Sequence, residues 1–192
     1  MRTIILATAN QHKVEELRAL LAGKSIQILS AAEVNFTEDI EETGATLEEN
    51  ALLKARRVHR ATGLPALADD TGLEVDALHG APGVRSARFA GEACSPADNR
   101  TLLLKMLNGV EQSKRTATFR CVLAFVDDNQ DHLFEGACPG TITNEEHGAG
   151  GFGYDAIFQP EGETRTLAEL SADEKNGISH RGRAVRKFWE FL

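Results

Sequence analysis

Two long strand patterns, 116–126 and 132–142, constrain the fold of this chain more than any other feature. Every second residue of the first run is apolar and falls on one face of an extended chain: Phe119, Cys121, Leu123 and Phe125. The stretch 127–131 between the runs is polar and typical of a turn. The pattern predicts a long β-hairpin. It leads directly into a glycine-rich segment, 148–155.

Shorter strand and helix patterns alternate through the rest of the chain. Short apolar runs predict strands at 3–7, 25–29, 65–68 and 73–76. Apolar stripes and capping signals predict helices at 10–21, 46–62, 95–108, 166–170 and 179–192. This alternation indicates an α/β fold.

Composition restricts the partners of this chain. Its 192 residues carry a formal net charge of −8, which argues against nonspecific binding to nucleic acid or to anionic membranes. An anionic small ligand remains compatible, because a metal ion and a few lysines reverse the local field. No apolar run resembles a signal peptide or a membrane span, and the three cysteines form no C-x-x-C pair. We expect a cytoplasmic protein with one domain over residues 1–192.

The turn after the first predicted strand is a candidate anion site. A helix that begins at the tip of a sheet presents backbone N–H groups and the positive end of its dipole. Thr8, Asn10 and Lys13 add a hydroxyl, an amide and an ammonium, which suit phosphate oxygens. The alternative is an ordinary connection in which Asn10 only caps the helix.

Two acidic clusters are candidate metal ligands. Glu38, Asp39, Glu41 and Glu42 precede the predicted helix 46–62, and Asp69 with Asp70 follows a predicted strand. Magnesium is commonly held by one or two carboxylates together with substrate phosphates. Adjacent residues of an extended chain point to opposite sides, so Asp69 and Asp70 should have different roles. The alternative is that the first cluster is simply solvated.

The segment Gly148–Asp155 has two interpretations. Its glycines let a ligand approach the backbone, and an aromatic ring with a neighbouring carboxylate suits a planar heterocycle. Alternatively, it is a glycine-rich hairpin whose Phe152 and Tyr154 belong to the core. Further along, His180 and Arg181 are predicted on the exposed first turn of the last helix, where the helix dipole disfavours a cation. That conflict is typical of functional sites.

Taken together, these motifs resemble the Ham1-type family of inosine and xanthosine triphosphate pyrophosphatases. The resemblance runs almost end to end, with the motifs in the same order: Leu6–Asn10 through Lys13, Glu41–Gly44, Glu49–Ala51 with Lys54, Ala68–Gly72, Gly151–Asp155 and Ser179–Gly182. It implies an α/β fold with an elongated, mixed, twisted sheet flanked by helices, in two lobes around a central cleft, and a homodimer. The implied reaction is Mg²⁺-dependent hydrolysis of a non-canonical purine nucleoside triphosphate (ITP, dITP or XTP) to the monophosphate and pyrophosphate.

The resemblance also implies roles for individual residues. The phosphates would be held by Lys54 and by the turn residues Thr8, Ala9, Asn10, Gln11, His12 and Lys13. Glu41 and Asp70 would hold Mg²⁺, Asp70 would also be the general base, and Thr71 would contact the substrate. Phe152 would stack on the base, which would be surrounded by Gly153, Tyr154, Asp155, Lys175, His180 and Arg181.

Two other functions are compatible with parts of this pattern. One is a related pyrophosphatase that acts on other modified or pyrimidine nucleotides, as the Maf-like proteins do. The other is a non-catalytic nucleotide-binding module. The acidic set disfavours the second, because a pure anion binder gains nothing from carboxylates beside phosphate.

Overall fold

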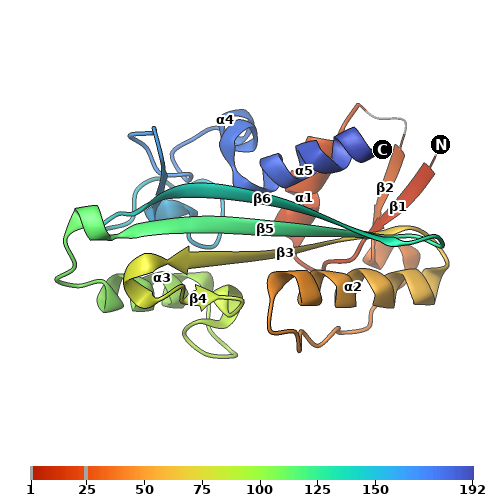
Figure 1. Ribbon diagram of the computed structural model, residues 1–192, viewed down its shortest axis with the longest axis horizontal. Coiled ribbons are helices and arrows are strands. Elements are labelled where there is room, and N and C mark those ends of the chain that lie inside the picture. The colour runs from red at the N-terminus through yellow and green to blue at the C-terminus, as the bar shows by residue number, and fades with distance from the viewer. Residues whose placement is uncertain (1, 24–25) are drawn as a thin grey trace. The chain divides into compact units, whose positions relative to one another are not determined.

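The computed structural model describes residues 2–23 and 26–192 and builds them into a mixed β-sheet with flanking helices (Figure 1). The strands are β1 (Arg2–Leu6), β2 (Ile26–Ser30), β3 (Ala66–Val75), β4 (Pro82–Gly83), β5 (Thr116–Val126), β6 (Asp131–Ile142) and β7 (Phe158–Pro160). The α-helices are α1 (Gln11–Leu21), α2 (Leu47–Thr62), α3 (Pro96–Met106), α4 (Ala172–Ile178) and α5 (His180–Phe191). Ser25, the first residue of one predicted strand, lies outside the described residues.

The sheet combines parallel and antiparallel pairs. Its strand order is β2-β1-β3-β5-β6-β7, and β4 pairs with β3. β1 runs parallel to β2 and β3, whereas β4 is antiparallel to β3 and β7 is antiparallel to β6. Only residues 127–130 connect β5 to β6, which suits a hairpin and is too short for a parallel crossover. The predicted hairpin and the mixed sheet are confirmed.

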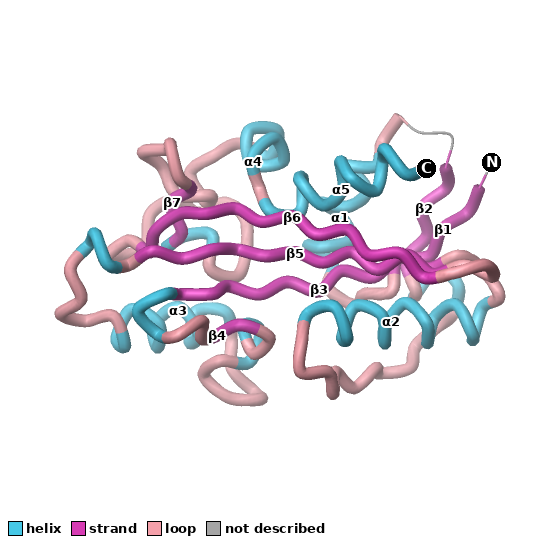
Figure 2. The backbone as a smooth tube through the Cα atoms, in the orientation of Figure 1, coloured by secondary structure: helices cyan, strands magenta, loops and turns pink. Residues whose placement is uncertain are grey.

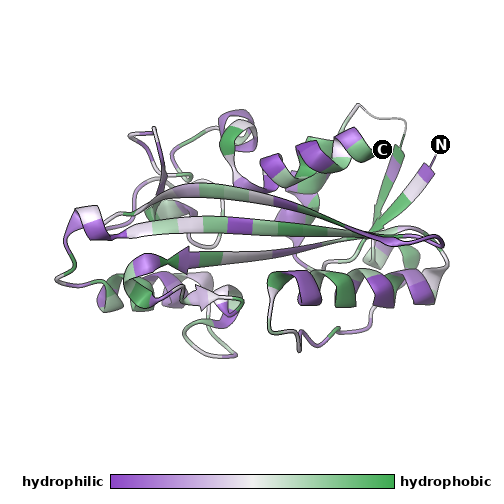
Figure 3. Cartoon of the chain, in the orientation of Figure 1, coloured by the Kyte–Doolittle hydropathy of each residue, from purple (hydrophilic) through white to green (hydrophobic). Residues whose placement is uncertain are grey.

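The chain forms two compact units, and the first comprises the described residues up to Asp70 together with 121–136 and 181–192. Helices α1 and α5 cover one face of its strands and α2 covers the other (Figure 1). Polar and apolar residues alternate along α2, as a helix with one buried side requires (Figure 3). The core beneath α1 and α5 includes Leu6, Val14, Leu17, Leu67, Phe125, Val185 and Phe188.

The second unit comprises Thr71–Arg120 and Ala137–His180. Its core combines strand residues such as Leu73 and Phe119 with Leu103 and Leu107 of the α3 region. Tyr154, Ile157 and Phe158, which follow the glycine-rich segment, join the same core. That segment is therefore anchored at its carboxyl end by buried aromatic and aliphatic side chains.

Two predicted elements differ from the structure. β3 is one continuous strand, where two strands separated by a loop were predicted, so Asp69 and Asp70 lie inside a strand. Cations on the neighbouring helices α1 and α2 pair with both carboxylates, which allows the strand to continue. The predicted helix 166–170 is a turn. The backbone N–H groups of Leu167 and Ala168 bond to distant carbonyls of this unit instead of to a helical ladder.

No helix among the described residues combines the length and apolar character needed to cross a membrane.

Candidate functional site

The first unit places the predicted phosphate turn beside the two aspartates. Leu6 of β1 pairs with Leu67 of β3, two residues before Asp69. Asn10 caps α1 by accepting a hydrogen bond from the Lys13 backbone N–H at 3.3 Å, and Thr8 Oγ1 accepts one from the Asn10 N–H at 3.2 Å. Asn10 therefore caps α1, and that the turn also binds an anion stays a prediction. The cap leaves the exposed surface of the turn available to an anion.

The turn also borders a pocket of about 340 Å³ within this unit. Thr8, Ala9 and Gln11 line it together with Lys54 of α2. Gln11 and His12 are exposed on the first turn of α1, and Lys13 is half-buried. Hydroxyl, amide and ammonium groups from two separate elements thus border one hollow, which suits a phosphate chain.

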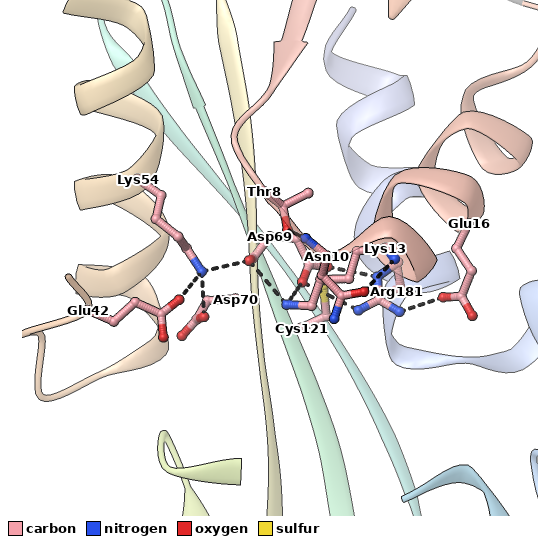
Figure 4. Close-up of polar contacts among 10 residues, drawn as sticks. All are labelled: Thr8, Asn10, Lys13, Glu16, Glu42, Lys54, Asp69, Asp70, Cys121 and Arg181. Atoms are coloured by element: carbon pink, nitrogen blue, oxygen red, sulfur yellow. Dashed lines mark hydrogen bonds and ion pairs between the residues drawn. The ribbon is translucent and has the colours of Figure 1, made fainter. Parts of the chain in front are cut away.

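Asp69 is the centre of a buried charged cluster on the α1 and α5 side of β3 (Figure 4). Lys13 Nζ lies 2.5 Å from Asp69 Oδ1, and Arg181 Nε lies 2.8 Å from Oδ2. Cys121 Sγ is 3.1 Å from the same Oδ2. Burial acts to raise the pKa of Asp69, but Arg181 and Lys13 outweigh it and hold that pKa well below its usual range. Asp69 is an ionised anchor for two cations.

Asp70 points to the opposite side of β3, toward α2 (Figure 4). Lys54 Nζ donates to Asp70 Oδ1 at 2.7 Å, to Glu42 Oε1 at 2.6 Å and to the backbone oxygen of Asp69 at 2.9 Å. Burial, with a contribution from Glu42, raises the pKa of Asp70 in spite of Lys54 and Lys13. Burial lowers the pKa of Lys54, but its two carboxylate partners outweigh this and raise it. The predicted opposite directions of Asp69 and Asp70 are confirmed, and each has different partners.

The structure gives Glu42, and not Glu41, the position beside Asp70. The segment between β2 and α2 runs alongside α2 (Figure 2). Glu41 is exposed where this segment borders the outer surface of the helix. Within residues 2–23 and 26–192, no group of three or more His, Cys, Asp or Glu side chains is arranged to hold a metal ion. Glu42 and Asp70, which both accept from Lys54, are two carboxylates close enough together to suit Mg²⁺. This ion takes its remaining ligands from water and substrate phosphates.

The second unit holds the predicted base-recognition residues. Phe152 is half-buried, and Lys175 Nζ lies 5.0 Å from its ring centroid. Asp155 Oδ2 accepts hydrogen bonds from the Phe152 backbone N–H at 2.8 Å and from Lys175 Nζ at 2.7 Å. The Asp155 carboxylate therefore fixes both the loop and the lysine beside the Phe152 ring.

Tyr154 belongs to the core, as the alternative interpretation of this segment expected. Tyr154 is 4% exposed, and its hydroxyl donates to the backbone oxygen of Ser86 at 2.8 Å. Gly153, between the two aromatic residues, is half-buried and accepts a hydrogen bond from Arg100 at 2.8 Å through its backbone oxygen. Only one of the two rings, that of Phe152, remains partly accessible to a ligand.

The exposed positions predicted for His180 and Arg181 are wrong. His180 is 3% exposed and its ring stacks on Phe119, with centroids 4.6 Å apart. Arg181 is 1% exposed and pairs with Asp69 and, at 2.5 Å, with Glu16 Oε2. The exposed-turn prediction failed because a fully buried carboxylate on a distant strand compensates the arginine. Thr71 follows Asp70 in β3 and is half-buried.

Sequence reasoning missed three residues that contact the charged groups around Asp69 and Asp70. Glu16 lies one turn after Lys13 on α1, so helical spacing indicates that the two share a face. Glu42 was placed among the acidic residues but without a role. Cys121 was assigned to the core, which is correct, but its contact with a carboxylate has no signal in the sequence.

Gly151 and Gly153 allow a matched test of the loop. Both have positive φ, at 68° and 62°. A Cβ built on Gly151 would lie 2.1 Å from Asp155 Oδ2, whereas no described atom lies within 4 Å of one built on Gly153. Gly153→Ala should lower the free energy of unfolding by about 1–2 kcal/mol, the cost of a left-handed alanine. Gly151→Ala should lose about 1–3 kcal/mol more, because Asp155 must move. Urea unfolding measures both; equal losses would contradict the role of Asp155.

The sequence and the fold were compared with those of known proteins. The sequence model of the Ham1 family matches residues 4–191. A protein of Porphyromonas gingivalis named dITP/XTP pyrophosphatase is 50% identical over 192 residues, 100% of this chain and 98% of that protein. One of the same name from Streptomyces avermitilis is 50% identical over 190 residues, covering 97% of this chain and 95% of that protein.

Solved structures agree with the sequence comparison. A HAM1 protein from Coxiella burnetii has a TM-score of 0.89 and 43% identity, covering 98% of this chain and 96% of that one. The Staphylococcus aureus Ham1 protein has a TM-score of 0.89 and 38% identity, covering 100% of this chain and 98% of that one. The full-length matches in both sequence and fold show that this chain belongs to the Ham1 family.

Proposed function

We propose that this chain is a Mg²⁺-dependent pyrophosphatase that hydrolyses XTP, ITP and dITP to the nucleoside monophosphate and pyrophosphate. This activity would clear deaminated purines from the nucleotide pool. The name dITP/XTP pyrophosphatase, carried by relatives that are 50% identical to this chain, supports the substrate class. That the chain forms a homodimer stays a prediction.

The observation that carries the proposal is the position of Asp70. Asp70 is 6% exposed, its Oδ1 accepts a hydrogen bond from buried Lys54, and in the metal-free chain its pKa is raised by burial. A base of raised pKa removes a proton from water more readily than an ordinary surface aspartate does. Asp70 would orient the attacking water and accept its proton as the new bond to the α-phosphorus forms.

The cations of the first unit would stabilise the charge that moves to the leaving pyrophosphate. Lys13 and Lys54 are each held by hydrogen bonds to β3, so they need no rearrangement during the reaction. Asp70 and Glu42 would hold Mg²⁺, which supplies charge neutralisation at phosphate oxygens and lowers the pKa of bound water when it is present. In this proposal Glu42 would hold the metal, where the family resemblance suggested Glu41.

Base selection would come from the second unit. Phe152 offers a ring for stacking, and Lys175 offers an ammonium, which only donates hydrogen bonds. A fixed donor favours the 6-oxo group of hypoxanthine and xanthine. It disfavours the 6-amino group of adenine, because two donors would then face each other unpaired.

A substrate panel tests this function. With Mg²⁺, kcat/KM for ITP, dITP and XTP should exceed that for ATP and GTP by about 100-fold or more. Pyrophosphate should be the primary product, and hydrolysis in ¹⁸O-labelled water should place the label in the monophosphate. Orthophosphate as the primary product, or equal rates on all purines, would refute the proposal. A preference for pyrimidine nucleotides would favour the Maf-like alternative. Binding of nucleotides without turnover would favour the non-catalytic nucleotide-binding module.

A further inference from the structure

Asn50 is a fully buried amide on α2 that has no part in the proposed reaction. Its Oδ1 accepts a hydrogen bond from the Gly44 backbone N–H at 2.7 Å. Within the part of the chain that the structure describes, its Nδ2 has no hydrogen-bond partner. A buried donor without a partner lowers stability, so packing alone does not account for an amide at this position.

Gly44 is fitted closely to the beginning of α2. A Cβ built on it would lie 2.6 Å from Asn50 Oδ1 and 2.7 Å from Glu49 Cβ. The next residue, Ala45, donates its backbone N–H to Glu49 Oε2 at 2.7 Å. The segment before α2 is therefore fixed to the helix by two side chains of the helix itself.

The same segment carries Glu42, two residues before Gly44. Glu42 Oε1 accepts from Lys54 Nζ at 2.6 Å, and Lys54 Nζ donates to Asp70 Oδ1 at 2.7 Å. Asn50 and Lys54 are one helical turn apart, so their side chains lie on the same side of α2. The contacts close a ring that runs from Asn50 through Gly44 and Glu42 to Lys54 and back along the helix.

We propose that Asn50 is a positioning residue: by holding Gly44, it sets where Glu42 meets Lys54 and so keeps Lys54 directed at Asp70. Its importance for turnover rests on the function proposed above. The structural part of the proposal does not, because it concerns contacts that exist without substrate or metal.

Amide hydrogen exchange measured by NMR, without nucleotide or Mg²⁺, tests the structural part. Asn50→Leu removes the acceptor and should accelerate exchange of the Gly44 amide about tenfold or more. Asn50→Asp keeps an acceptor oxygen and should preserve most of the protection. The matched control is Asn99→Leu, because Asn99 is also buried and accepts the Ala90 N–H at 2.7 Å. It should leave Gly44 unchanged. Unchanged Gly44 exchange in Asn50→Leu would overturn the proposal.

A double-mutant cycle tests the consequence for turnover. Asn50→Leu should lower kcat about tenfold, and adding it to Glu42→Gln should cause little further loss, because both act on Lys54. Asn99→Leu combined with Glu42→Gln should instead give the product of the separate effects. Independent effects of Asn50→Leu and Glu42→Gln would refute the route through Glu42.

The experiments also cover a variant that does not fold and a wild-type chain that hydrolyses none of the nucleotides. If Asn50→Leu does not fold, Gly44→Ala tests the same contact from the other side, because its Cβ cannot coexist with Asn50 Oδ1. Gly44→Ala should then lower kcat and show the same lack of additivity with Glu42→Gln. If the wild-type chain hydrolyses none of the nucleotides, the proposed function fails, while the exchange experiment still decides whether Asn50 holds Gly44.

Discussion

Asp70→Asn is expected to lower kcat about 10³-fold, within the range that general bases contribute. Asparagine has nearly the same shape and keeps an oxygen that can accept from Lys54, but it cannot take a proton from water. KM for ITP should change much less than kcat, because Lys13 and Lys54 remain to hold the phosphates. An active Asp70→Asn variant would remove Asp70 from the mechanism.

The same substitution should leave the fold intact. The pKa of Asp70 is raised by burial and by Glu42 above its value in the unfolded chain, despite the opposing effect of Lys54. A raised folded-state pKa means that the stability this group contributes is present at low pH and is lost as pH rises through that pKa. Above that pKa the ionised form costs stability, which Asp70→Asn removes, while Lys54 keeps Glu42 and gains an amide oxygen as acceptors, so the variant should have nearly the wild-type free energy of unfolding in urea. If the variant is strongly destabilised, its loss of activity is explained by unfolding and not by the loss of a base.

The local pattern of the sequence predicted which way the two aspartates point but not what they meet. Strand periodicity alone places Asp69 and Asp70 on opposite faces. The partners of Asp69 come from elements 56 and 112 residues away, Lys13 and Arg181, and pairing at such separations depends on the whole topology. For the same reason a first-turn arginine that appeared exposed is buried.

The sequence pattern also could not distinguish between neighbouring residues of the same type. Glu41 and Glu42 have the same charge and similar neighbours, and only the path of the segment before α2 decides which reaches Lys54. That path depends on the contact between Gly44 and Asn50. Phe152 and Tyr154 differ in the same way: both are aromatic residues in a glycine-rich run, but the Tyr154 hydroxyl finds a buried carbonyl and the ring joins the core.

Arg181→Leu is expected to lower the free energy of unfolding by about 3–5 kcal/mol, the usual cost of removing one partner from a buried ion pair. Asp69 is fully buried and would lose the guanidinium that pairs with it, although Lys13 would stay beside it, and Glu16 would lose its contact with the guanidinium. Lys187→Leu on the exposed side of α5 is the control and should change stability by no more than about 0.5 kcal/mol. Urea unfolding at pH 7 measures both.

The pH dependence of stability gives this prediction a second readout. In the wild-type chain Arg181 and Lys13 hold the pKa of Asp69 well below its unfolded value, so Asp69 stabilises the fold above the usual carboxyl pKa of about 4. That stability is lost as pH falls toward the depressed pKa. Without Arg181 the pKa of Asp69 should rise, and acid unfolding should begin at a higher pH than in the wild type. A variant of unchanged stability whose only defect is a smaller preference for ITP over ATP would instead place Arg181 at the base, as the family resemblance implied.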